Sequence, residues 1–146
     1  MAFKFQFQSI LDLKVRLEDA KKNEYGRVIA LLNEEKEILN GYKKEMIDLQ
    51  NNIKSKISAG FTITEIITMN QYIVIIDNKI QRQNKKIEEL KVLVEKKRLE
   101  LVQAAKEKKM FETLKEKKFE EYREAMNRRE QQDIDELITF RNRKKD

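Results

Sequence analysis

Adjacent carboxylates are the side chains in this sequence that come nearest to a catalytic arrangement. The chain of 146 residues contains 26 Asp and Glu residues, and pairs such as Glu34 with Glu35 or Glu88 with Glu89 have the residue types of a general acid and base. Neighbours in a helix point about 100° apart, so such a pair cannot converge on one substrate. Histidine and cysteine are absent, which removes the commonest general base and thiolate zinc sites. We therefore expect no enzymatic activity, no metal and no cofactor.

The composition is typical of a long helix or coiled coil. Charged residues make up 40% of the chain, proline is absent, and the only glycines are Gly26, Gly41 and Gly60. No stretch is long and apolar enough to span a membrane, and no Gly-rich phosphate loop is present. We expect an all-α, cytoplasmic protein that does not insert into a membrane and acts through its surfaces.

Basic residues are in excess mainly in the C-terminal third. They alternate with acidic residues there, as in the run that contains Lys106, Glu107, Lys108, Lys109 and Glu112. Interleaved charges are typical of a solvated helix face, and we prefer that interpretation to contact with nucleic acid or anionic lipid. A basic coiled coil that binds nucleic acid is the alternative function, although the sequence lacks the aromatic interleaving of a stacking platform.

Two heptad patterns predict two helices that pack along one stripe each. The first comprises Tyr25, Leu32, Leu39, Met46 and Ile53, with Val28, Glu35, Tyr42 and Leu49 as companions. The second comprises Ile66, Ile73, Ile80, Ile87, Val94 and Leu101, with Met69, Ile76, Gln83, Leu90, Lys97 and Ala104 three residues later. Upstream, Phe3, Ile10 and Leu17 share a heptad position, and we expect a four-residue stutter near Lys21 to join them to the first pattern.

The segment KISAGFTITEII predicts the turn between the helices. Gly60 can end a helix in the left-handed conformation, and Thr62 with Glu65 forms a capping box that starts the next. A short connection makes the helices antiparallel neighbours, so the numbers of facing residues should add up to about 121. We expect one coiled-coil domain over residues 1–146, an antiparallel hairpin with helix one at about 3–58, the turn at about 58–62 and helix two at about 62–140.

Both ends of the chain contain apolar residues that the two paired heptad patterns do not account for. A helical start places Phe3 and Phe7 on the first stripe and leaves Phe5 pointing away, whereas a start at Ser9 makes residues 2–8 an extended arm. Helix two should project by about 20 residues beyond helix one, roughly 30 Å. A lone helix cannot bury the apolar residues of this projection, which therefore fold back, fray or meet a partner.

The sequence resembles the FliJ family, small coiled-coil proteins of the bacterial flagellar type III export apparatus, which serves motility. Three stretches carry the resemblance, namely the start MAFKFQFQSILDL, the segment Met69-Asn70-Gln71-Tyr72-Ile73 after the turn, and LKEKKFEEYREAMNRREQQDIDEL in helix two. It implies a stalk, similar to that of rotary ATPases, that enters the hexameric ring of the export ATPase FliI and promotes its assembly and activity. The equivalent stalk of a virulence type III secretion system is a related alternative.

The resemblance also implies partners and contact residues. Beyond the ATPase, it implies contact with the export-gate membrane protein FlhA, an association with export chaperones, and a peripheral location at the inner membrane, with no nucleic-acid partner. The gate-contact candidates are Tyr42, Met46, Tyr72, Ile76, Lys79 and Gln83. The ATPase-ring candidates are Phe3, Phe5, Phe7, Phe119, Tyr122 and Met126.

Overall fold

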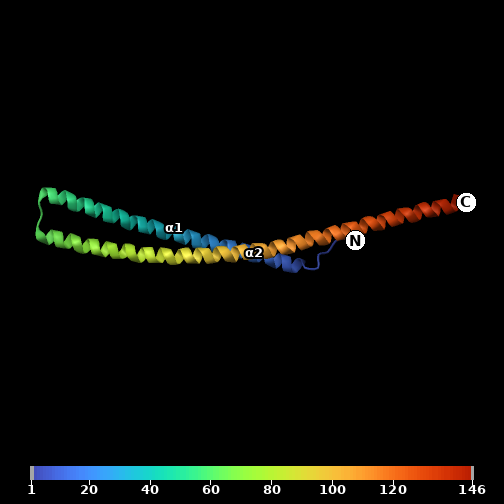
Figure 1. The fold of residues 1–146 in the computed structure, drawn as a ribbon, viewed down its shortest axis with the longest axis horizontal. Helices are drawn as coiled ribbons and strands as arrows, with labels where there is room; N and C mark the ends of the chain where they lie inside the picture. Colours follow the sequence, from blue (N-terminus) through green and yellow to red (C-terminus); the bar gives the residue numbers. More distant parts are fainter. Residues whose placement is uncertain (1, 146) are drawn as a thin grey trace. The chain divides into compact units, whose positions relative to one another are not determined.

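The computed structural model describes residues 2–145 and contains two long helices (Figure 1). Helix α1 spans Gln8–Ala59 and helix α2 spans Ile63–Lys145, and the described residues contain no strand. The absence of proline lets both helices run for 52 and 83 residues without a break in their backbone hydrogen bonds. The expected all-α hairpin with a longer second helix is therefore confirmed.

The turn between the helices uses the residues that its sequence indicated. Gly60 adopts φ of 82°, a left-handed conformation that costs glycine little and ends α1. The Thr62 hydroxyl accepts a hydrogen bond from the Glu65 backbone N–H at 3.3 Å, and the Thr62 carbonyl accepts one from the Ile66 N–H at 3.2 Å. The Thr62 side chain thus satisfies one of the free N–H groups at the start of α2.

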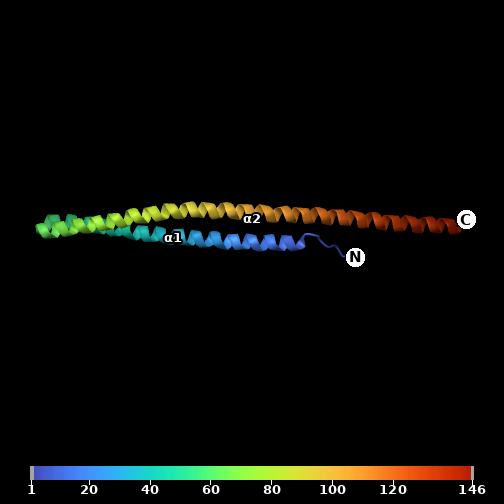
Figure 2. The ribbon, with the colours of Figure 1, turned by 90° about the horizontal axis from the view of Figure 1, so that it is seen from below.

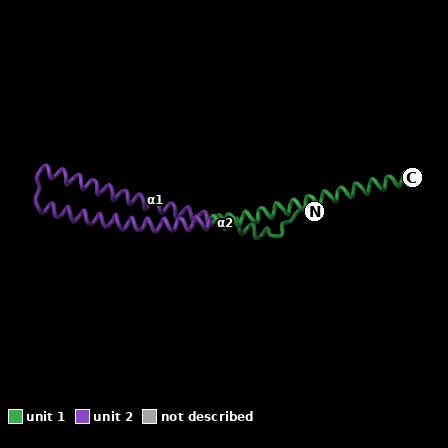
Figure 3. The backbone as a smooth tube through the Cα atoms, viewed as in Figure 1, with its two compact units in different colours: residues 1–20, 102–146 green, residues 21–101 purple. Residues whose placement is uncertain are grey.

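Contacts within the chain divide it into two units, which are coloured separately in Figure 3. The turn unit comprises residues 21–101, and the terminal unit comprises the residues up to 20 together with those from 102 onward. Both helices contribute to both units. That the two units form one domain stays a prediction.

In the turn unit, α1 and α2 run antiparallel (Figures 1 and 2), and residues of the predicted heptad seams form their core. Its main core cluster consists of Leu32, Leu39, Ile87 and Leu90, with Ile80, Leu93 and Val94 packed against it. The pairing rule holds, because Lys21 faces Glu100 and Lys79 lies over the ring of Tyr42, and the residue numbers of each pair add up to 121. The sequence therefore predicted the alignment of the two helices as well as their existence.

In the terminal unit, the seam of α1 follows a different phase from the one we expected. Leu11 and Glu18 are buried, and both are spaced by sevens from Tyr25, so no stutter near Lys21 is needed. Ile10 and Leu17, which hydrophobicity alone had assigned to the seam, are 39% and 38% exposed. The expectation failed because an ion pair fills this part of the seam: the Glu18 carboxylate lies 3.1 Å from Lys108 Nζ.

The helical start that we expected at about residue 3 is also wrong. Helix α1 begins at Gln8, and its first hydrogen bonds run from the Gln8 N–H to the Phe5 carbonyl and from the Leu11 N–H to the Phe7 carbonyl. Residues 2–7 form a non-helical arm, as in the alternative interpretation, although Gln6 and Phe7 lie in a turn and not in extended backbone. Phe5 does not point away, since only 8% of it is exposed. The arm brings the rings of Phe3 and Phe7 against aromatic rings of α2.

Candidate interaction surfaces

Surfaces are the candidate sites of this chain. In the described part of the chain, no group of three or more acidic residues lies close enough to hold a metal ion, and none of the helices there is long and apolar enough to cross a membrane. Two groups of side chains combine exposure with aromatic character. One lies in the turn unit and the other in the terminal unit.

The first group, which we name the tyrosine surface, comprises Tyr42, Met46, Tyr72 and Lys79. Lys79 Nζ lies 5.8 Å from the centre of the Tyr42 ring, a geometry that gives a favourable cation–π contact between the two helices. Tyr72 is 47% exposed, and its hydroxyl donates a 3.4 Å hydrogen bond to Glu45 on α1. Tyrosine is a common anchor at protein interfaces because it brings a large contact area with little conformational entropy to lose.

Two gate-contact candidates lie beneath this surface rather than on it. Ile76 is 1% exposed and Gln83 is 8% exposed, so neither offers a partner a usable area. The Gln83 amide donates a 2.9 Å hydrogen bond to the backbone carbonyl of Glu35 and a second one to the Glu35 carboxylate. These two residues belong to the helix interface because they occupy the inner companion seam.

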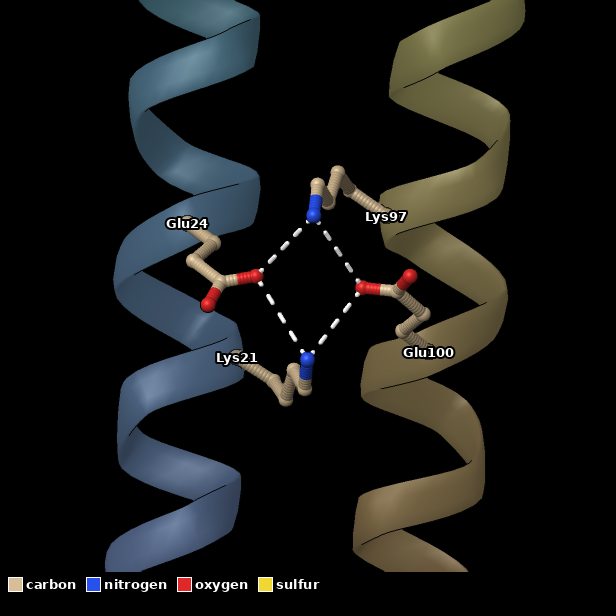
Figure 4. Close-up of polar contacts among 4 residues, drawn as sticks. All are labelled: Lys21, Glu24, Lys97 and Glu100. Atoms are coloured by element: carbon tan, nitrogen blue, oxygen red, sulfur yellow. Dashed lines mark hydrogen bonds and ion pairs between the residues drawn. The ribbon is translucent and has the colours of Figure 1, made fainter.

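A closed ring of ion pairs joins the helices near the other end of the turn unit (Figure 4). Lys97 Nζ lies 3.2 Å from Glu24 and 3.3 Å from Glu100, and Lys21 Nζ lies 3.6 Å and 3.3 Å from the same two carboxylates. The hydrogen bond from Lys97 is the main cause that lowers the pKa of both carboxyls, and Glu24 in turn raises the pKa of Lys97. These pKa shifts favour the charged forms of Glu24, Glu100 and Lys97.

This ionic ring fixes the register of the helices more than it adds stability. Solvent-accessible ion pairs are worth little individually. A slip of one heptad would instead place Glu24 opposite Leu90 or Ala104, where its charge would lose Lys97, and Lys21 would lose Glu100. Only one alignment of α1 on α2 pairs these charges, so the ring selects that alignment.

The second group, which we name the aromatic cluster, holds the arm on α2 in the terminal unit. The ring of Phe3 lies 5.4 Å from that of Phe119 and 5.5 Å from that of Tyr122, and the ring of Phe7 lies 6.4 Å from that of Phe111. Phe5 contacts the Phe7 ring at 5.8 Å. Such tilted and edge-to-face contacts are the favourable ones for aromatic pairs.

Of the ring-contact candidates, the structure brings all but Met126 into this cluster. Phe119 is 45% exposed, Phe3 and Phe7 are half-buried, and Phe5 is buried. Sequence reasoning missed Phe111, although it continues the companion seam of α2 seven residues after Ala104. Phe5 is a structural member of the cluster, and only partners that displace the arm could reach it.

An exposed apolar face near the turn also escaped the sequence reasoning. Ile63, Ile67, Val74 and Ile75 are 76%, 53%, 58% and 50% exposed. The available signal was the stretch ITEIITMNQYIVII, which holds more apolar residues than one seam can bury.

Comparison with known proteins assigns a family to this two-helix chain. A family model described as "Flagellar FliJ protein" matches residues 3–146. The chain belongs to the FliJ family of flagellar proteins. The flagellar FliJ protein of Bacillus subtilis (strain 168) is 30% identical over 89 residues, which are 60% of this chain and 59% of that relative. The match therefore spans about three fifths of the relative's length.

A solved structure shares the fold of this FliJ-family chain. The putative YscO homolog from Chlamydia trachomatis has a TM-score of 0.57 at 20% sequence identity, and the alignment covers 95% of this chain and 94% of that chain. At this identity the likeness concerns the fold alone. Within the FliJ-family chain, the gate candidates all lie in the turn unit and the ring candidates all lie in the terminal unit.

Proposed function

We propose that this chain is the coiled-coil stalk of the bacterial flagellar type III protein export apparatus. It inserts into the hexameric export ATPase ring, promotes assembly and turnover of the ring, and links it to the export gate. The match to the FliJ family over residues 3–146 carries the proposal. The two long antiparallel helices support it, because a stalk acts through contacts along its helices and needs no chemistry of its own. The protein acts in the cytoplasm, peripherally at the inner membrane.

The two partners use different units of the chain. The ring contacts the terminal unit, through Phe3, Phe7, Phe119, Tyr122 and Met126 on its surface and with Phe5 holding the arm in place. Aromatic and sulfur-containing side chains that remain partly accessible suit an interface that must form and turn over. The gate protein contacts the tyrosine surface, whose shape depends on Ile76 and Gln83 beneath it.

An ATPase assay tests the ring contact. Adding the purified chain to its cognate hexameric export ATPase should raise both ATP hydrolysis and the fraction of assembled rings. Phe119→Ala should weaken the stimulation, because it removes the most exposed ring of the aromatic cluster. An ATPase rate that stays unchanged at low salt and at saturating concentrations of the natural chain would contradict the proposal.

Binding to the purified cytoplasmic part of the gate protein tests the other contact. Tyr72→Ala should weaken gate binding and leave ATPase stimulation intact, whereas Phe119→Ala should do the reverse. Each variant is thus the control for the other, and circular dichroism checks that both remain helical. Equal loss of both activities in either variant would mean that the two surfaces do not serve separate partners.

A further inference from the structure

The C-terminal end of α2, residues 127–144, contains an acidic block and a basic block that lie too far apart along the helix to pair with each other. We name this segment the overhang; every residue in it is exposed. After Arg128 and Arg129, its charged residues form an acidic block, Glu130, Asp133, Asp135 and Glu136, followed by a basic block, Arg141, Arg143 and Lys144. The order of the blocks distinguishes the overhang from the rest of α2, where the charges alternate.

Helical spacing explains why these charges stay apart. Ion pairs within a helix join residues three or four positions apart. The preceding turns use this spacing, as in Glu120 with Arg123 and Glu124 with Arg128. No acidic residue of the overhang has a basic residue three or four positions after it, and only Asp133 has one, Arg129, four positions before it. Among the described side chains, neither Glu130 nor Arg141 forms an ion pair.

The same segment presents an apolar stripe to solvent. Ile134, Leu137, Ile138 and Phe140 are 49%, 65%, 52% and 58% exposed. An isolated helix has nothing to bury such a stripe against, although a second helix of matching pattern would cover it. A partner helix would satisfy both patterns if it covered the apolar stripe and placed basic residues opposite the acidic block of the overhang.

We propose that the overhang pairs antiparallel with the overhang of a second copy of this chain. When Ile134 of one copy lies opposite Leu137 of the other, the same alignment places Glu130 opposite Arg141. The two-fold symmetry of the pair repeats each contact, so two apolar layers lie at the centre and one oppositely charged layer flanks them on each side. Alternating positions of the two helices then form a short coiled-coil seam.

Charge excludes the parallel alternative. In a parallel pair, Glu130 would lie against Glu130 and Arg141 against Arg141, which is repulsive in both blocks. The antiparallel pair replaces both repulsions with attractions. Its seam is short, below the size of a stable interface, so we expect a reversible dimer with a dissociation constant on the order of 10–100 µM.

Sedimentation equilibrium of the full chain tests the pairing and needs no other protein, so its outcome is independent of the proposed function. The natural chain should shift from monomer to dimer with rising concentration, and less so at high salt, which screens the flanking charges. A monomer throughout the range from about 1 µM to about 500 µM would overturn the proposal.

A charge exchange tests the alignment. Glu130→Arg and Arg141→Glu should each weaken dimerisation by about tenfold, because each puts like charges opposite one another in both symmetric layers. The double variant carries both exchanged charges and should recover the natural affinity. Lys36→Glu, at an exposed position of α1, makes the same change of net charge as Arg141→Glu and should have no effect. Failure of the double variant to recover would reject this alignment.

Disulfide formation tests the direction, since the chain has no cysteine of its own. Mixing Ile134→Cys chains with Leu137→Cys chains should give mainly the mixed disulfide, because those positions face each other only in the antiparallel pair. A size tag on one chain separates the products. Predominant self-disulfides at either position would indicate a parallel pair and would overturn the proposal.

Discussion

Gln83 on α2 donates both of its side-chain hydrogen bonds to Glu35 on α1, one to the backbone carbonyl and one to the carboxylate. The pair lies in the companion seams of the turn unit, where Leu32, Leu39, Ile87 and Leu90 form the neighbouring core. Lys86 approaches the same carboxylate at 2.9 Å, and the bond from Gln83 is the main cause that lowers the Glu35 pKa. A polar pair in an apolar seam favours one register over others.

Replacing only one member of this pair should destabilise the fold. Gln83→Leu leaves the Glu35 carboxylate beside an apolar side chain, so the thermal midpoint should fall. The double variant Glu35→Leu with Gln83→Leu should regain the lost stability or exceed it, because both polar groups are then absent. Thermal denaturation followed by circular dichroism measures both. A double variant less stable than the single one would show that the pair stabilises more than an apolar layer does.

Two adjacent isoleucines should differ sharply in their contribution to stability. Ile76 is 1% exposed, so Ile76→Ala should lower the free energy of unfolding by about 2–4 kcal/mol through lost burial and a cavity. Ile75 is 50% exposed, and Ile75→Ala should change it by less than about 1 kcal/mol. Urea unfolding of both variants provides the comparison. Equal effects would mean that the seam of α2 has another phase.

Replacing the glycines within α1 by alanine should increase the stability of the fold. A Cβ at Gly26 or Gly41 would meet no heavy atom within 4 Å, so either residue can become alanine without a clash. Each substitution should raise the free energy of unfolding by about 0.5–1 kcal/mol, because alanine loses less backbone entropy in a helix. Gly60→Ala is the control of opposite sign, since φ of 82° strains any residue with a Cβ. A destabilising Gly26→Ala would indicate a contact at that position that the isolated chain does not make.

The inter-helix ion pairs predict how stability depends on pH. The pKa values of Glu24, Glu100 and Glu107 are lowered, each mainly by a hydrogen bond from a lysine, so their stabilisation is present at neutral pH and lost as pH falls through the lowered values. The pKa values of Lys97 and Lys108 are raised by Glu24 and Glu18, so their stabilisation is lost as pH rises through the raised values.

Thermal midpoints measured across pH should therefore form a plateau that declines below about pH 4 and above about pH 10.5. Lys97→Met should make both declines smaller, because it removes one of the two lysines that pair with the carboxylates of the ring. Added salt should lower the plateau slightly, since these groups are accessible to solvent. Stability that increases on acidification would contradict the assigned partners.

The sequence predicted the apolar part of the hairpin well and the charged part poorly. Gly60 and Thr62 located the turn through local backbone chemistry, and the isoleucines of α2 set the seam by their spacing. The phase of α1 before Lys21 could not be predicted, because Glu18 is buried while Ile10 and Leu17 are exposed. Hydrophobicity alone does not reveal that a lysine 90 residues later compensates a buried carboxylate.

For the candidate surfaces too, some predictions from the sequence were confirmed and others were wrong. Tyr72 was expected to be partly exposed, and Lys79 was expected to face Tyr42; both are confirmed. Phe5 was expected outside the core and is buried, because residues 2–7 are not helical and the helical spacing that pointed Phe5 away does not apply to them. The arm contacts rings of α2 that are more than 100 residues away in the sequence, which local signals do not report.

The types of contact between α1 and α2 change along the helix interface. This change predicts which part of the interface unfolds first. Around Leu32 and Leu90 the core is apolar, with the pair of Glu35 and Lys86 beside it, whereas from Lys21 toward the N-terminus of α1 the contacts include Lys14 with Glu107 and Glu18 with Lys108. Local unfolding should therefore start among these last ion pairs and stop at the leucines, which hydrogen exchange would record as two levels of protection. Raising the ionic strength should lower the protection of the first level more than that of the second.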